Sequence, residues 1–121
     1  MFEIKCRYEG PDKIAQLWDT VPEYYMTQIQ GQLEICDQAF CDFVAWCPSK
    51  GMRVIRVERQ PAYWEWMQGL MEEFLAYYES DIPPPRLKRK PQYSGPAIDM
   101  KIYTCGAYVD GVGWCSQWKP L

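Results

Sequence analysis

A strict alternation of apolar and charged residues near the start of the chain constrains the fold most. Residues 2–7 read Phe-Glu-Ile-Lys-Cys-Arg. Because successive side chains of a β-strand point to opposite faces, this period of two predicts a strand over residues 2–8 with one apolar and one charged face. Glu3 and Lys5 therefore project from the same face, one pleat apart.

Helix and strand patterns alternate along the next part of the chain. They predict a short helical turn over residues 14–20, a helix over 21–36, strands over 39–47 and 52–57, a helix over 61–80, and short strands around 100–103 and 107–109. The first long helix carries a polar and aromatic stripe at helical spacing, formed by Tyr25, Gln28 and Gln32. The order β-α-β-β-α followed by a turn-rich tail predicts a mixed sheet of the α/β (α+β) class.

Changes in composition divide the chain into three segments. We expect a folded region over residues 1–82, a proline-rich basic linker over 83–95 and a turn-rich tail over 96–121. The linker opens with three consecutive prolines and carries a cluster of basic residues, namely Arg86, Lys88, Arg89 and Lys90. Such a cluster is suited to contact with a polyanion such as DNA or to a role as a nuclear address, although a solubilising linker explains it equally well.

The composition excludes several classes of chemistry. The 121 residues include no histidine and carry a formal net charge of −3. Histidine-dependent nucleophiles and histidine-ligated metal sites are therefore excluded, which leaves carboxylate, lysine and tyrosine chemistry with an oxygen-ligated cation. Since the chain is not basic overall, any contact with a polyanion depends on a local patch.

The six cysteines show no metal-binding spacing and no secretory leader precedes them. We interpret them as reduced, largely buried thiols of an intracellular protein, cytoplasmic or nuclear and not secreted. No apolar run reaches the length of a membrane span. Cys41 and Cys47 lie about 20 Å apart along one strand face, too far to share an iron–sulfur cluster.

Three motifs in order resemble one family of nucleases. They are Phe2-Glu3-Ile4-Lys5-Cys6, Tyr25-Met26-Thr27-Gln28-Ile29-Gln30, and Val54-Ile55-Arg56-Val57-Glu58-Arg59 leading into the long helix. Together they resemble the C-terminal part of the nuclease core in the lambda-exonuclease-like (YqaJ viral recombinase) family of the PD-(D/E)XK superfamily. The resemblance covers residues 2 to about 80 and implies a restriction-endonuclease-like mixed sheet.

The resemblance also implies roles for individual residues. Glu3 and the backbone carbonyl of Ile4 would bind Mg²⁺ or Mn²⁺, and Lys5 would orient and activate the attacking water. Tyr25 and Gln28 would position the lysine, the water or a DNA phosphate. The implied activity is exonucleolytic degradation of DNA from duplex ends, in support of recombination and often by a homo-oligomer.

The family pattern also has acidic residues upstream of the Glu-X-Lys strand, where this sequence has only Met1 and Phe2. We therefore expect a truncated or split enzyme that is weak or inactive unless a second chain supplies the acids. The alternative is a non-catalytic, nuclease-derived module that binds DNA or a partner protein. Glu3 and Lys5 are also explained by a solvated ion pair, and Arg53, Arg56 and Arg59 by ion pairs on a solvent face.

Overall fold

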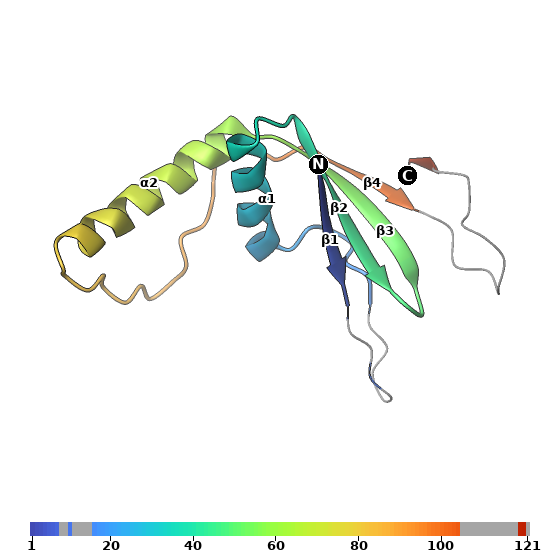
Figure 1. The fold of residues 1–121 in the computed structure, drawn as a ribbon, viewed down its shortest axis with the longest axis horizontal. Coiled ribbons are helices and arrows are strands. Elements are labelled where there is room, and N and C mark those ends of the chain that lie inside the picture. Colours follow the sequence, from blue (N-terminus) through green and yellow to red (C-terminus); the bar gives the residue numbers. More distant parts are fainter. Residues whose placement is uncertain (8–9, 11–15, 105–118, 121) are drawn as a thin grey trace. The chain divides into compact units, whose positions relative to one another are not determined.

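The computed structural model describes residues 1–7, 10, 16–104 and 119–120 (Figure 1). The chain divides into two compact units. Residues Met1–Arg59 and Ile98–Leu121 form the first, which contains the sheet and helix α1, and residues Gln60–Ala97 form the second, which contains helix α2.

A mixed β-sheet is the frame of the first unit. Its strands, in spatial order, are β1 (Phe2–Cys6), β2 (Phe40–Cys47), β3 (Gly51–Glu58), β4 (Met100–Thr104) and β5 (Lys119–Pro120). Strand β1 is parallel to β2, whereas the other pairs are antiparallel. A parallel neighbour needs a crossover connection, and α1 (Glu23–Ile35) supplies it. The expected α+β class is confirmed.

Local sequence explains where α1 begins and where the β2–β3 hairpin turns. The carbonyl of Pro22 accepts hydrogen bonds from the amides of Tyr25 and Met26, so the proline begins the helix without needing an amide of its own. Strands β2 and β3 pair from Cys47 and Gly51 across a three-residue loop. Gly51 has a φ of 76°, a left-handed conformation that glycine adopts without strain.

The core of this unit lies between α1 and one face of the sheet. Alternate residues of β2 are fully buried, namely Cys41, Phe43, Ala45 and Cys47. Ile29 and Leu33 of α1 and Ile55 of β3 are likewise fully buried. The strand periodicity therefore sets which face packs, and the intervening residues of β2 point to the opposite face.

The second unit is built on α2 (Pro61–Glu79), which the Gln60 side chain begins by accepting a hydrogen bond from the Ala62 amide. The rings of Tyr63, Trp66 and Tyr93 pack together with centroids 4.8–5.7 Å apart. This contact returns the segment after the proline run to the first half of the helix. The second half of the helix instead carries exposed apolar residues, namely Met71, Phe74, Leu75 and Tyr78.

The expected and observed elements differ in two described stretches, residues 16–20 and strand β5 (Lys119–Pro120), which no sequence pattern predicted. The helical turn expected over residues 14–20 is wrong for residues 16–20, which form no helix, and residues 14–15 lie outside the described part of the chain. The strand expected around 107–109 also lies outside it. Within the described ranges, neither helix has the length and apolar character needed to cross a membrane.

Gly69 lies inside α2, and replacing it with alanine is expected to stabilise the protein by about 0.5–1 kcal/mol. A Cβ atom at this position would meet nothing within 4 Å, so the gain in helix propensity carries no steric cost. The midpoint of urea unfolding should rise at an unchanged slope. A lower midpoint would contradict the open surroundings of this glycine.

Candidate functional site

The charged face of β1 lies beneath α1. The Lys5 ammonium is 2.6 Å from Glu3 Oε1, and the two side chains are only 21% and 14% exposed. Lys5 Nζ also donates to Gln28 Oε1 at 3.4 Å and sits 4.4 Å from the centroid of the Tyr25 ring. The structure thus brings together the four side chains to which sequence reasoning assigned a catalytic role.

A fifth polar side chain belongs to this cluster. Gln32 Nε2 donates to Glu3 Oε2 at 3.3 Å, so both oxygens of the Glu3 carboxylate have partners. The amide oxygen of Gln32 is buried and has no hydrogen-bond partner among the described residues. Sequence reasoning placed Gln32 on the stripe of Tyr25 and Gln28 but assigned it no role. Its position one helical turn after Gln28 was the available signal.

Aromatic rings support the cluster from inside the unit. The Tyr25 ring packs 5.6 Å from Phe43 of β2 and 5.7 Å from Trp18. Trp18 in turn packs 5.8 Å from Phe43 and carries the Arg7 guanidinium at 4.7 Å. The resemblance assigned no role to Trp18, because this residue lies outside the three motifs that carry the resemblance.

The two glutamines of the Tyr-X-X-Gln-X-Gln motif have different positions. Gln28 is exposed and reaches Lys5, whereas Gln30 is 1% exposed and donates from Nε2 to the Glu58 carbonyl at 2.9 Å. Gln30 therefore joins α1 to the end of β3, where it satisfies a backbone carbonyl that helix packing would otherwise leave without water. Gln30 therefore connects two elements of the fold and is not part of the cluster around Lys5.

The Ile4 carbonyl lies outside the β1–β2 ladder. Met1 O accepts from the Asp42 amide, and the Arg7 amide donates to Trp46 O. In a parallel ladder, every second residue of a strand directs its backbone N–H and C=O toward the same neighbouring strand. Since Met1 and Arg7 bond β2, the odd-numbered residues of β1 are the ones that face β2. The backbone groups of Ile4 consequently point to the other edge of β1, where β2 does not use them.

The described residues do not by themselves fit Mg²⁺ or Mn²⁺. Within the described ranges, no three His, Cys, Asp or Glu side chains lie together as a possible metal site. The cluster holds one carboxylate, whose charge Lys5 offsets at 2.6 Å. Gln32 Oε1 and the Ile4 carbonyl add oxygen atoms but no charge, whereas divalent ions of this class are usually held by carboxylates.

Asp42 lies on the opposite face of the sheet from Glu3 and cannot complete the cluster. Its β1 partner is Phe2, so its side chain follows the apolar face. Both Asp42 oxygens accept from Arg56, at 2.8 Å each, and this pairing raises the Arg56 pKa. The Arg56 guanidinium also lies 3.8 Å from the centroid of the Phe40 ring.

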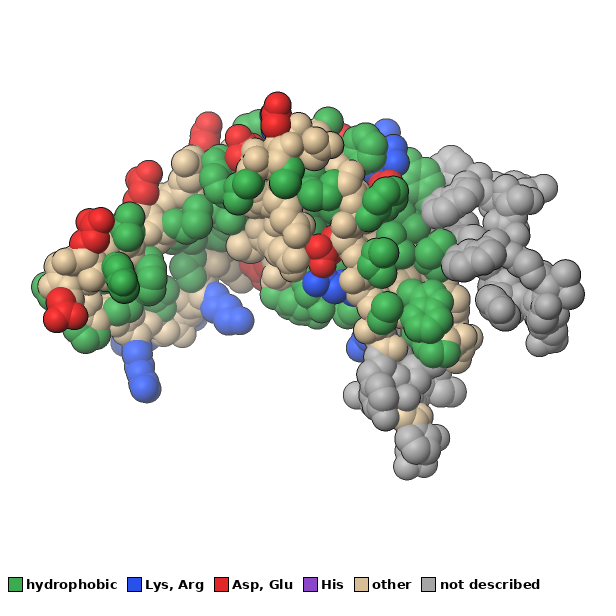
Figure 2. Space-filling model, in the orientation of Figure 1, with side chains coloured by type: hydrophobic (Ala, Val, Ile, Leu, Met, Phe, Trp, Pro, Cys, Tyr) green, Lys and Arg blue, Asp and Glu red, His purple; other side chains and the backbone are tan. Residues whose placement is uncertain are grey.

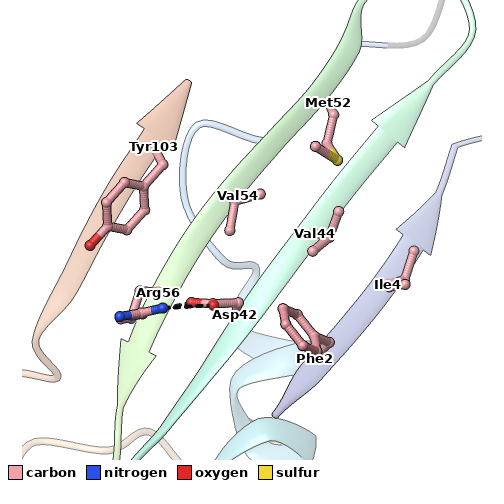
Figure 3. A pocket seen from close by; sticks show the side chains of 8 residues that line it. All are labelled: Phe2, Ile4, Asp42, Val44, Met52, Val54, Arg56 and Tyr103. Carbon is pink, nitrogen blue, oxygen red and sulfur yellow. Dashed lines mark hydrogen bonds and ion pairs between the residues drawn. The ribbon is translucent and has the colours of Figure 1, made fainter. Parts of the chain in front are cut away.

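This apolar face is hollowed by a pocket of about 450 Å³ (Figure 3). Phe2, Ile4, Asp42, Val44, Met52, Val54, Arg56 and Tyr103 line it. Figure 3 shows the Asp42–Arg56 pair across β2 and β3 at one end, with aromatic and aliphatic side chains over the rest. The sheet therefore has one polar site under α1 and one apolar hollow on its other face.

The basic residues singled out by sequence as candidate phosphate contacts form ion pairs or lie exposed. Arg53 pairs with Asp19, Arg56 with Asp42, and Arg59 with Asp37 and Glu34. The expected ion pairing of these arginines is confirmed. The linker residues of the candidate DNA-binding cluster are all exposed, namely Arg86, Lys88, Arg89 and Lys90. Figure 2 shows acidic side chains along α2, so that helix offers no basic surface on the face drawn.

None of the cysteines that the structure describes forms a disulfide. Cys41 and Cys47 are buried, whereas Cys6 and Cys36 are exposed, so the expected burial is confirmed for the first two alone. Burial raises the pKa of the Cys41 thiol to about 11. Cys41 is therefore protonated at neutral pH and unsuited to nucleophilic chemistry.

The Glu3 carboxylate gives the site a pH dependence. The hydrogen bond from Lys5, with help from Gln32 and Gln28, lowers the pKa of Glu3 below its ordinary value of 4.5 against the opposing effect of partial burial. A carboxyl with a lowered pKa contributes stability that is present above the unfolded pKa and is lost as the pH falls through the folded pKa.

We therefore expect the free energy of unfolding of the wild type to exceed that of Glu3→Gln by a constant amount above about pH 5. The difference should shrink as the pH is lowered from 4.5 through the folded pKa of Glu3, because the unfolded chain binds a proton at this carboxyl more readily than the folded protein does. Urea unfolding of both proteins between pH 7 and pH 3 measures it. A difference that is independent of pH would contradict the stabilising contacts of the carboxylate.

Comparison of the chain with protein-family models, with curated protein sequences and with solved structures gives no match. The geometry of the Glu3–Lys5–Tyr25–Gln28 cluster is therefore the feature from which a function can be inferred.

Proposed function

We propose that residues 1–82 form part of a metal-dependent deoxyribonuclease of the lambda-exonuclease (YqaJ) type, with a restriction-endonuclease-like sheet. The observation that supports this is the polar face of β1, where Glu3 and Lys5 meet Gln28 and Tyr25 of α1. A lysine beside a carboxylate on a strand, covered by an amide-bearing helix, suits the binding of a phosphodiester.

In this proposal each side chain acts on the DNA backbone or on water. Lys5 binds a phosphate oxygen or holds the attacking water, and its contact with the Tyr25 ring fixes the direction of the ammonium. Gln28 is exposed and orients the lysine or a phosphate through its amide. In nucleases of this type a bound Mg²⁺ or Mn²⁺ activates water and stabilises the charge that develops on phosphate.

The site requires further carboxylates, since the described residues supply a single one. We propose that a second chain completes it, and that the isolated chain cleaves weakly or not at all. The substrate would be the ends of duplex DNA in the cytoplasm or nucleus, with Arg86, Lys88, Arg89 and Lys90 as additional phosphate contacts.

The contacts of Glu3 favour a second candidate function, a non-catalytic module that binds DNA or a partner protein. Both oxygens of Glu3 already have partners, in Lys5 and Gln32. A carboxylate held in this way keeps the shape of a nuclease site without offering a free ligand to a cation. The exposed Gln28 face and the basic linker would then bind DNA without cleaving it.

A nuclease assay on linear duplex DNA with Mg²⁺ or Mn²⁺ separates the two candidates. If the chain is an enzyme, DNA is degraded, and Lys5→Ala lowers the rate by about 100-fold or more. Lys50→Ala is the matched control, because it removes an exposed lysine from the hairpin loop and should leave the rate unchanged.

Retention of DNA in a mobility-shift assay without degradation would support the module instead. Degradation that Lys5→Ala leaves intact would contradict the proposed site. If a chain that is shown to be folded neither degrades DNA nor retains it, both candidates are contradicted.

A further inference from the structure

The outer edge of β1 is an unpaired strand edge among the described residues. Strand β1 ends the spatial order of the sheet, with β2 as its neighbour on one side. Its odd-numbered residues face β2, so the amides and carbonyls of Phe2, Ile4 and Cys6 face outward. The side chains of Phe2 and Ile4 are 71% and 62% exposed. A strand edge with unpaired backbone groups, no proline and no bulge is a template for pairing with another strand.

We propose that this edge pairs with the β1 edge of a second copy of the chain, antiparallel and about a two-fold axis through Ile4. In this register Ile4 lies opposite Ile4 of the other copy, Phe2 lies opposite Cys6, and Glu3 lies opposite Lys5. The contact is isologous, because the same patch on each copy meets itself and the pairing closes as a dimer.

Backbone geometry limits the pairing to registers in which even-numbered residues lie opposite even-numbered residues. The outward groups belong to the even-numbered residues, so an antiparallel ladder must place even residues opposite even residues. With Ile4 at the centre, Ile4 forms one hydrogen-bonded pair with its counterpart, and Phe2 and Cys6 form two more. The odd-numbered residues then fall at non-hydrogen-bonded positions, where opposing side chains approach more closely.

Charge selects a single register among these. A shift of two residues in one direction places Glu3 opposite Glu3, and the opposite shift places Lys5 opposite Lys5. Like charges directly opposite one another destabilise a ladder, whereas the register centred on Ile4 pairs Glu3 with Lys5 twice. A parallel, in-register pairing would also place like charges together.

The apolar face of the sheet continues across the proposed seam. Phe2 and Ile4 line one side of the 450 Å³ pocket, next to Val44 and Val54 of the neighbouring strands (Figure 3). Pairing of two β1 strands joins the two sheets into one, with Phe2, Ile4 and Cys6 of each copy along a common apolar stripe. Apolar area that is exposed in one copy is thereby buried in the dimer.

The same register adds a carboxylate to the candidate site, an extension that rests on the proposed function. The Glu3 residues of the two copies become diagonal neighbours on the polar face, about 7–8 Å apart at their Cα atoms. Long side chains at this separation can approach a common point. The second copy would thus supply a negative charge that the described residues of one copy do not.

Charge reversal tests the pairing by sedimentation equilibrium. The wild type should have the mass of two chains. Glu3→Lys places lysine opposite lysine and Lys5→Glu places glutamate opposite glutamate, so each variant alone should be monomeric. An equimolar mixture restores both opposite-charge pairs and should return to the mass of two chains. Ile4→Pro, which removes an outward amide that β2 does not use, should give a folded monomer.

A monomeric wild type at about 0.1 mM would overturn the proposal, as would single variants that remain dimeric or a mixture that stays monomeric. If the charge variants fail to fold, as judged by circular dichroism, cross-linking decides. Ile4→Cys combined with Cys6→Ser and Cys36→Ser should form an intermolecular disulfide between the two introduced thiols at the two-fold axis, whereas Cys6→Ser with Cys36→Ser alone should form no cross-link through this strand. No disulfide would overturn the pairing. The nuclease assay is read independently, so failure of one proposal is not failure of the other.

Discussion

Replacing Phe43 with alanine is expected to lower the free energy of unfolding by about 3–5 kcal/mol. Phe43 is fully buried at the centre of β2, between α1 and the sheet. Its ring contacts Tyr25 and Trp18, so the substitution removes apolar burial and leaves a cavity beside both rings. Urea unfolding followed by tryptophan fluorescence and by circular dichroism measures the loss.

The same substitution should loosen the candidate site, because Tyr25 is the ring on which the Lys5 ammonium sits. Phe74→Ala is the matched control, since it makes the same change at a 60% exposed position of α2. It should alter the free energy of unfolding by no more than about 0.5 kcal/mol. Equal losses for the two variants would contradict the placement of Phe43 in the core.

The second large effect is expected at Asp42, where alanine should cost about 2–3 kcal/mol. The Asp42 side chain is 10% exposed and accepts two hydrogen bonds from Arg56. Its removal leaves the guanidinium, which is only one-third exposed, without its anionic partner on the apolar face. Urea unfolding at neutral pH measures this cost.

A double-mutant cycle separates the pair from its parts. Asp42→Ala with Arg56→Met removes both charges and should recover much of the stability that Asp42→Ala loses. Asp19→Ala is the control, because it removes an ion pair in which the carboxylate is 94% exposed, and it should cost at most about 1 kcal/mol. Additive losses from the two single variants would indicate that Asp42 and Arg56 do not interact.

Local patterns predicted most elements of the fold to within two residues. The helix expected over residues 21–36 is observed as Glu23–Ile35, and the strand expected over 39–47 as Phe40–Cys47. These elements are recognisable because each carries its own periodicity and its own end signals, such as Pro22 before α1. The helical turn expected over residues 14–20 depended on the spacing of Ile14, Leu17 and Trp18 alone, about one turn of pattern, and residues 16–20 form no helix.

Contacts between strands could not be read from periodicity. The alternation in β1 shows two faces but not which of them packs, and the structure places the charged face under α1 and leaves Phe2 and Ile4 exposed. The Asp42–Arg56 pair likewise depends on the β2–β3 register, which the turn around Gly51 fixes. Register is a property of two strands, and a pattern within one strand does not contain it.

Part of the candidate site followed from sequence because its members are close in the chain. Glu3 and Lys5 share a strand face by the pleat alone, and Gln28 and Gln32 share a helix face by the helical turn alone. That the strand face and the helix face meet was predicted only by the resemblance, which needs the three motifs together. Trp18 and the split roles of Gln28 and Gln30 became visible only with the tertiary contacts.

We propose the polar face of β1 under α1 as a phosphate site that offers a cation a single carboxylate, and Mn²⁺ tests this proposal most directly. Paramagnetic Mn²⁺ broadens amide NMR signals near a binding site even when binding is weak. At low Mn²⁺ concentration we expect selective broadening at residues 3–5 and at Gln28 and Gln32, and loss of that broadening in Glu3→Gln. Broadening confined to exposed acids such as Glu72 and Glu73, with residues 3–5 unaffected, would contradict the claim.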